Sequence, residues 1–381
     1  MMKNPTIERY IDSLLEKSTP TRPVWNMEAI RQGKAPSWNY VDGCMIKAIL
    51  DLYAITGDKR YAEFADAFID YHVLEDGSIR NYRVDEFNLD NINAGKTLFE
   101  LYDLTGKEKY RKAIDLIYTQ VLTQPRNREG SFWHKLIYPT QIWLDGLYMC
   151  QPFYVEYETR FNDCKNYPDI FKQFATCARC LRDEKTGLYY HAYDSSRTMY
   201  WCDKETGLSR HFWIRALGWY TMALLDTMDK MDRERFPEDY KMMRGLFVDL
   251  IDSMLRFQDE SGMWYQVVDQ GGRERNYLET SGSSIMAYAI FKGIRLGFLP
   301  QSYYAAGEKA FLGICDRYLS DVNGELNLGG ICLVAGLGGK TRRDGSYDYY
   351  MSEPVVENDA KGVAPFLLAY TELLRRDQAG L

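Results

Sequence analysis

The stretch LYAITGDKRYAEFADAFID, which begins at Leu52, recurs in a related form as LYDLTGKEKYRKAIDLIY, which begins at Leu101. Each copy contains the end of one helix, a Thr-Gly turn and a second helix. Gly57 and Gly106 stand where a helix end favours a residue in the left-handed conformation. An internal repeat of this kind indicates a fold built from successive helical hairpins.

The same template extends along the whole chain as two sets of helices. One set is nearly apolar around its circumference, as in YTMALLDTM and SIMAYAIFKGI, and is predicted to be buried; the other is amphipathic and is predicted to cover it. The buried set is predicted at 39–56, 90–105, 140–159, 212–231, 280–297 and 359–377, and the covering set at 58–72, 107–122, 167–182, 238–257 and 302–318.

The N-terminal segment MMKNPTIERYIDSLLEKS supplies the covering helix that this count lacks. It is amphipathic and has capping residues near Asn4 and Pro5. Six hairpins then close a ring, which predicts an all-α fold, an (α/α)6 barrel, as a single domain over residues 1–381. Pieces that begin at or near a glycine are predicted to form short extended loops or strands at one end of it: DGSIRNYR, EGSFWHK, TGLYYHAYD, SGMWYQVVD and DGSYDYY.

Composition narrows the class of protein. A hydrophobic content of 46% indicates a folded chain, and a net charge of -7 without a basic run argues against a nucleic-acid partner. No apolar stretch is long enough to cross a membrane, and the first residues lack the apolar core of a signal peptide, which favours a cytoplasmic location. Cys177 and Cys180 form a lone CxxC, for which reduced thiols are favoured over metal or redox chemistry. No histidine pair has metal-ligand spacing, so no metal is expected.

The run from Trp143 to Met149, WLDGLYM, places Asp145 among apolar residues. A carboxyl in that setting loses hydration, so its pKa is expected to rise, and a raised carboxyl can act as a general acid near neutral pH. The alternative is a structural Asp with a buried partner that offsets the cost of desolvation.

In the predicted topology all the buried helices begin at one mouth, and unusual polar residues gather there. Asp42 and Asp359 are as compatible with helix N-caps as with function, and Thr280 and Ser281 are expected to be caps. An inward-facing Arg215 needs an anion, which could be Asp90 or a ligand carboxylate. The other candidates at the mouth are Tyr40, Trp213, Trp219, His134, Lys135 and His191, of which the two tryptophans could also be core residues.

Several motifs resemble the unsaturated rhamnogalacturonyl hydrolases, glycoside hydrolase family 105, and more distantly the unsaturated glucuronyl hydrolases of family 88. These motifs are DNINAGKTL, FWHK, IWLDGLYM, YYHAYD, FWIRALGW, LETSGSSIMAYAI, RDGSYDYYMSEP and ENDAKGVAPFLLA. The resemblance implies an (α/α)6 barrel with Asp145 as general acid and base, assisted by Asp90. It also implies a substrate site formed by Tyr40, His134, Lys135, Met149, His191, Trp213, Arg215 and Trp219.

The resemblance further implies the reaction. An oligosaccharide made by a polysaccharide lyase would lose its terminal 4,5-unsaturated uronic acid after hydration of the double bond, with no metal or cofactor and in a monomer or homodimer. One departure lies at Ala216 and Leu217, where many relatives read RGNGW around the same Arg and Trp. Three alternatives stay open: a glucuronyl hydrolase acting on glycosaminoglycan fragments, a sugar epimerase that uses His134 and His191, and a sugar-binding toroid without catalysis.

Overall fold

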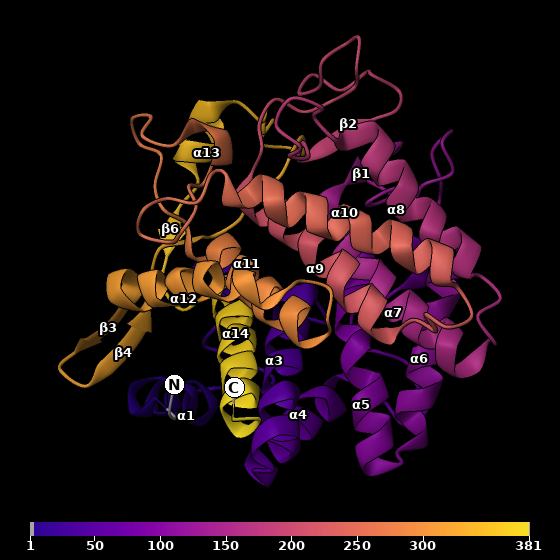
Figure 1. Ribbon diagram of the computed structural model, residues 1–381. Helices are drawn as coiled ribbons and strands as arrows, with labels where there is room; N and C mark the ends of the chain where they lie inside the picture. The colour runs from indigo at the N-terminus through magenta and orange to yellow at the C-terminus, as the bar shows by residue number, and fades with distance from the viewer. Residues whose placement is uncertain (1–3, 381) are drawn as a thin grey trace.

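A closed ring of inner helices forms the centre of the computed structural model, which describes residues 4–380 (Figure 1). Each inner helix packs against the next, and the last one returns to pack against the first. Around the ring these are α3 (Tyr40–Thr56), the 3-10 helix η2 (Leu89–Gly95) continued by α5 (Lys96–Thr105), α7 (Leu144–Phe161), α9 (Ile214–Lys230), α11 (Thr280–Arg295) and α14 (Ala360–Gln378).

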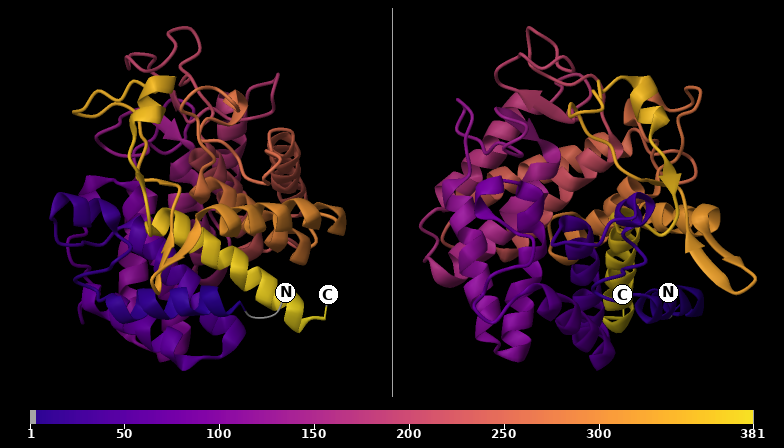
Figure 2. Two further views of the ribbon diagram at one scale, coloured as in Figure 1. Left: turned by 90° about the vertical axis from the view of Figure 1, so that its left-hand side faces the viewer. Right: turned by 180° about the vertical axis from the view of Figure 1, so that it is seen from behind.

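A second layer of helices covers the ring. Each outer helix packs against an inner neighbour, in the order α4 (Lys59–His72), α6 (Glu108–Thr123), α8 (Tyr167–Leu181), α10 (Pro237–Leu255) and α12 (Tyr304–Tyr318). Helix α1 (Pro5–Lys17) fills the remaining place beside α14, where the Asn4 amide donates to the Tyr370 hydroxyl over 2.9 Å (Figure 2). The predicted (α/α)6 barrel, including the role of the N-terminal helix, is confirmed.

Local signals explain where the helices begin and end. Gly57 and Gly106 end α3 and α5 with positive φ angles of 69° and 66°, a conformation that costs glycine little. The Asn4 side chain caps α1 by accepting from the Thr6 amide over 3.0 Å. Close packing within the ring also depends on glycine, because a Cβ on Gly43 would lie 2.6 Å from the Ala94 Cα.

The short elements at the mouth differ in part from the prediction. Strand β1 (Gln141–Trp143) pairs with β2 (Ala192–Asp194), so the third inner helix begins only at Leu144. The prediction that DGSYDYY is extended is wrong. Helix α13 (Tyr347–Ser352) forms there, and Ser346 caps it by accepting from the Tyr349 amide. The remaining short elements are α2 (Met27–Gln32), the hairpin β3 (Leu319–Val322) and β4 (Glu325–Leu328), and the pair β5 (Ile331–Cys332) and β6 (Val355–Val356); there are further 3-10 turns at Val84–Glu86, Val268–Gln270 and Gln301–Tyr303.

The two candidate aspartate caps behave differently. Asp359 caps α14, since its carboxylate accepts from the Lys361 amide over 3.0 Å. Asp42 is not a cap: Asn39 caps α3 instead and accepts from the Asp42 amide. The Asp42 carboxylate turns inward and accepts from the Trp25 indole over 2.9 Å, and burial raises its pKa to about 6.

Thr280 and Ser281 were predicted to be caps, but neither of them caps α11. Glu279 caps α11 and accepts from the Gly282 amide over 2.7 Å. The Thr280 hydroxyl donates to the Gly329 carbonyl, and the Ser281 hydroxyl donates to Glu279. A carboxylate with several donors to accept from outcompetes two hydroxyls for the end of this helix.

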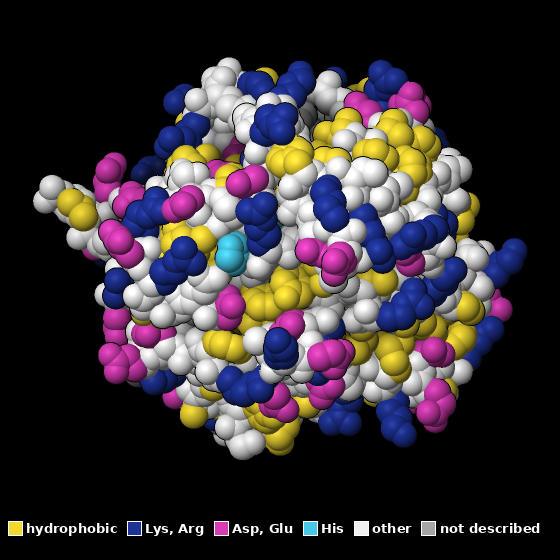
Figure 3. All heavy atoms as spheres, turned by 90° about the horizontal axis from the view of Figure 1, so that it is seen from above, with side chains coloured by type: hydrophobic (Ala, Val, Ile, Leu, Met, Phe, Trp, Pro, Cys, Tyr) yellow, Lys and Arg dark blue, Asp and Glu magenta, His cyan; other side chains and the backbone are white. Residues whose placement is uncertain are grey.

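The outer surface carries both signs of charge. Seen from above, from the side of α13, β1 and β2, Lys and Arg side chains are interspersed with Asp, Glu and apolar side chains (Figure 3). No helix within residues 4–380 combines the length and the apolar character needed to cross a bilayer. In the same part of the chain no three His, Cys, Asp or Glu side chains are grouped so that they could hold a metal ion.

Candidate active site

A cavity of about 290 Å³ opens at the end of the barrel where the inner helices begin. Its wall combines residues from α2 and from the starts of α3, η2 and α7 with loops that cross the mouth. Of the residues predicted from the sequence, the wall contains Tyr40, Asp90, His134, Lys135, Asp145 and Met149. It also contains Glu28, Tyr138, Trp143, Val334, Ala335, Gly336 and Arg343, none of which was predicted.

Asp145 stands in the first turn of α7, where it meets His191. The pairing of β1 with β2 brings them together, and the Leu144 amide donates to the His191 carbonyl over 3.1 Å. His191 Nε2 then lies 3.4 Å from Asp145 Oδ2, within ion-pair distance, although neither atom makes a hydrogen bond to a described residue. The other ring nitrogen of His191 lies 2.8 Å from the Tyr350 hydroxyl, so the imidazole is held between the tyrosine and the carboxylate.

The predicted rise in the pKa of Asp145 is wrong for the free protein. Burial does raise it, but the imidazole of His191, 3.4 Å away, outweighs burial. The pKa of Asp145 is therefore below its ordinary value, and at neutral pH the group is a carboxylate. The sequence signal failed because it described only the apolar neighbours along the chain.

Asp90 opens the second inner helix and is paired with Lys135. The Leu89 amide donates to the His134 carbonyl over 3.1 Å, which places the loop that carries His134 and Lys135 against the start of η2. The Asp90 carboxylate lies 2.5 Å from Lys135 Nζ and 3.6 Å from His134 Nε2. Burial by itself would lower the pKa of the Lys135 ammonium. The neighbouring Asp90 outweighs burial, so this pKa is raised. Burial lowers the pKa of His134 to about 4, so this imidazole is neutral at neutral pH.

One wall of the cavity is aromatic. The rings of His134 and Trp143 stack with centroids 4.6 Å apart, and Trp143 stacks in turn on Tyr138 at 5.0 Å. Arg343 closes this wall, because its guanidinium donates to the Tyr138 hydroxyl over 2.8 Å. Flat faces of this kind suit sugar rings, and the guanidinium adds a positive charge at the edge of the cavity.

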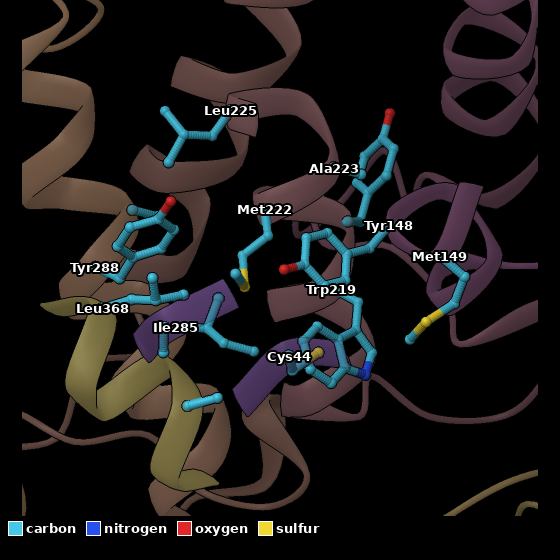
Figure 4. Packing of buried hydrophobic residues seen from close by; sticks show 14 of the residues in the cluster. Cys44, Tyr148, Met149, Trp219, Met222, Ala223, Leu225, Ile285, Tyr288 and Leu368 are labelled. Carbon is cyan, nitrogen blue, oxygen red and sulfur yellow. The ribbon is translucent and has the colours of Figure 1, made fainter. Parts of the chain in front are cut away.

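Tyr40 and Met149 form another part of the cavity wall, and Trp219 packs behind Tyr40. Met149 lies one helical turn after Asp145, so both project from the same face of α7. Trp219 is not in the wall. Its ring makes an edge-to-face contact with Tyr40, with centroids 6.5 Å apart. It also stacks on Tyr148 at 5.0 Å (Figure 4).

Arg215, Trp213 and His191 also lie behind the wall. The expected anion partner of Arg215 is not Asp90: its guanidinium donates to the Cys332 and Leu333 carbonyls and to the Ser281 hydroxyl. Arg215 therefore anchors the segment that continues into the wall at Val334–Gly336. Trp213 packs against His191, with ring centroids 4.8 Å apart, and donates its indole hydrogen to Gln266.

Some of the unpredicted wall residues could have been identified from sequence motifs, and others could not. Arg343 belongs to the motif RDGSYDYYMSEP, so its motif could have singled it out. Trp143 lies within the motif IWLDGLYM, and Tyr138 lies between FWHK and that motif. Glu28 and the segment from Val334 to Gly336 carry no local signal, because only the tertiary fold brings them to the mouth.

Known proteins resemble this chain over most of its length. It matches Glycosyl Hydrolase Family 88 over residues 10–377. Protein Atu3128 of Agrobacterium fabrum is 37% identical over 230 residues, which are 58% of this chain and 97% of that protein. Unsaturated rhamnogalacturonyl hydrolase YesR of Bacillus subtilis is 26% identical over 266 residues, which are 68% of this chain and 72% of that protein.

Solved structures give the same assignment. A glycoside hydrolase of family 105 from C. acetobutylicum ATCC 824 superposes with a TM-score of 0.89 and 42% identity, covering 97% of this chain and 99% of the other. An unsaturated glucuronyl hydrolase specific for heparin shares the fold with a TM-score of 0.69 and 14% identity, over 98% and 96% of the two chains. The chain therefore belongs to glycosyl hydrolase family 88, is closely similar to a family 105 enzyme, and is a glycosidase of the type that acts on unsaturated glycosides.

Proposed function

We propose that this glycosidase removes a 4,5-unsaturated galacturonic acid from the non-reducing end of rhamnogalacturonan fragments. The observation that carries the proposal is the setting of Asp145. Its carboxyl faces a cavity with a stacked aromatic wall, and its partner is an imidazole rather than a permanently charged lysine or arginine. The similarity to an unsaturated rhamnogalacturonyl hydrolase supports the choice of the galacturonyl over the glucuronyl substrate.

Asp145 would act first as an acid and then as a base. Protonation of C4 of the substrate places positive charge on C5, which the ring oxygen stabilises. A water molecule adds to C5 and returns a proton to the carboxylate. The resulting hemiketal opens to a ketone, and the hemiacetal left at C1 releases the rest of the oligosaccharide. The net reaction consumes one water, and one carboxyl serves both proton transfers.

Binding of the substrate itself favours the protonated form of Asp145 that the first step requires. Asp145 is a carboxylate in the free protein, so it must gain a proton before it can donate one. The uronate carboxylate brings a negative charge into the cavity and displaces water, and both effects raise the pKa of a neighbouring carboxyl. Lys135 and Arg343 provide positive charge in the wall that can hold the uronate.

The experiment is an ultraviolet assay of the conjugated double bond. Wild-type protein should remove the absorbance of unsaturated rhamnogalacturonan disaccharide, whereas Asp145→Asn should not, although it keeps the shape of the side chain. If only the glycosaminoglycan disaccharide loses its absorbance, the proposed reaction is supported and the proposed substrate is overturned. Isomerisation without bond cleavage, or binding without turnover, would overturn the reaction.

A further inference from the structure

A second cavity lies deeper along the barrel, toward the ends of the inner helices. It encloses about 210 Å³ and shares no wall residue with the cavity at the mouth. Each of the inner helices contributes charged side chains to it, from Lys47 on α3 to Arg375 on α14. We call it the lower cavity.

Charges in the lower cavity are paired with one exception. Lys47 lies 2.7 Å from Asp51, and Lys292 lies 2.8 Å from Asp226. The other cations of the wall, apart from Lys96, also have a carboxylate within ion-pair distance: Lys230, Arg295 and Arg375. The paired carboxylates thus each have a cation of their own, and none of them is the counter-ion of Lys96.

Lys96 is the exception. Its side chain is only 6% exposed, and no carboxylate within residues 4–380 comes within ion-pair distance of its ammonium. The ammonium makes no hydrogen bond to a described residue and rests on the face of the Tyr148 ring, 3.6 Å from the centroid. Burial lowers the pKa of Lys96 to about 8; the charge of Asp226 opposes this effect, and the charges of Lys47 and Lys292 add to it.

The lower cavity is separate from the substrate cavity. Tyr148 stacks on Trp219 (Figure 4). Trp219 in turn meets Tyr40 edge to face, so a column of rings divides the ammonium of Lys96 from the mouth. Its route to solvent is on the opposite side, where the side chains of Lys230 and Glu100 are 32% and 25% exposed. A ligand of the lower cavity would therefore enter independently of the substrate.

We propose that the lower cavity binds a small monovalent anion, such as chloride, against Lys96. A buried ammonium without a counter-ion is costly, and a small anion offsets that cost. The charges of Lys47 and Lys292 favour negative charge at this point, whereas the charge of Asp226 opposes it. The carboxylates around the rim, among them Asp51 and Glu100, disfavour a larger or multiply charged anion.

Thermal unfolding at constant ionic strength tests the proposal, with chloride replaced by the bulky anion gluconate. If the dissociation constant is about 10 mM, about 200 mM chloride lowers the unfolding equilibrium constant roughly 20-fold. Lys96→Met keeps the aliphatic stem and should lose this response. Lys230→Met is the matched control: it removes a lysine of the same cavity that has its own carboxylate, so it should keep the response.

Crystals of the wild-type protein grown with bromide in place of chloride give a second readout that does not depend on the folding of a variant. The expected result is an anomalous peak within hydrogen-bond distance of Lys96 Nζ. An empty lower cavity in these crystals overturns the proposal. So does an equal chloride response in wild type and Lys96→Met, or no response in wild type.

Discussion

Replacing His191 with Phe should move the activity of this glycosidase to higher pH. His191 Nε2 lies 3.4 Å from Asp145 Oδ2 and is a main reason that the pKa of this carboxyl is low. Phe keeps a ring between Trp143 and Trp213 but removes the ring nitrogens and any charge that they carry. An opposite charge within about 4–6 Å lowers the pKa of a carboxyl by about 1–3 units, so the loss of the imidazole should raise the pKa of Asp145 by about 1–2 units.

The sign follows from the proposed role of Asp145 as proton donor. Its protonated form is active in the first step, so kcat/KM falls as pH rises above its pKa. A higher pKa keeps the carboxyl protonated to higher pH, and the falling limb of kcat/KM should move up by about 1–2 pH units. The assay is the initial rate of loss of the double-bond absorbance across a pH series.

His72→Phe is the control for this experiment. His72 is also buried but lies outside the cavity, next to Phe68 and Trp38. Its replacement should leave the position of the limb unchanged. A limb that stays in place or moves to lower pH in His191→Phe would refute the assignment of the proton donor.

Three other substitutions test the supports of the cavity and the core. A Cβ on Gly146 would lie 3.0 Å from His134 Nδ1, so Gly146→Ala should lower kcat/KM about 10- to 100-fold while the thermal midpoint changes little. Arg215→Met leaves the Leu333 carbonyl and its neighbour without donors and should cost about 3 kcal/mol in urea denaturation, partly restored in Arg215→Lys. Asp42 has a pKa of about 6, raised by burial, so the folded state binds its proton more tightly than the unfolded state does. The free energy of unfolding should therefore fall by ~3 kcal/mol between about pH 4 and pH 6, and Asp42→Asn should remove that slope.

The helices were predictable because their signals are local. The Thr-Gly ends at Gly57 and Gly106 and the all-round apolar runs set both the number of hairpins and their order. Errors arose where a competing local group decided the outcome. Ser346 started a helix in an expected loop, and Glu279 displaced Thr280 and Ser281 as the cap of α11.

The environment of the candidate site was less predictable, because it depends on contacts distant in sequence. Asp145 could be singled out by its apolar neighbours, but its partner His191 arrives only through the pairing of β1 with β2. That partner reverses the sign of the expected pKa change. In the same way Arg215 binds carbonyls of a segment far along the chain, and no spacing in the sequence indicates this.

The two carboxylates at the mouth have different partners, and this difference assigns them different proposed roles. Asp90 lies 2.5 Å from Lys135, whose ammonium stays charged because its pKa is raised, so Asp90 is suited to hold charge in place rather than to transfer protons. Asp145 has only an imidazole beside it and can exchange a proton when substrate arrives. Asp145→Asn should therefore lower kcat at least about 10³-fold and remove the falling pH limb. Asp90→Asn should reduce kcat/KM but keep the limb, because the proton donor is intact. Loss of the limb in Asp90→Asn, with the limb retained in Asp145→Asn, would exchange the two roles.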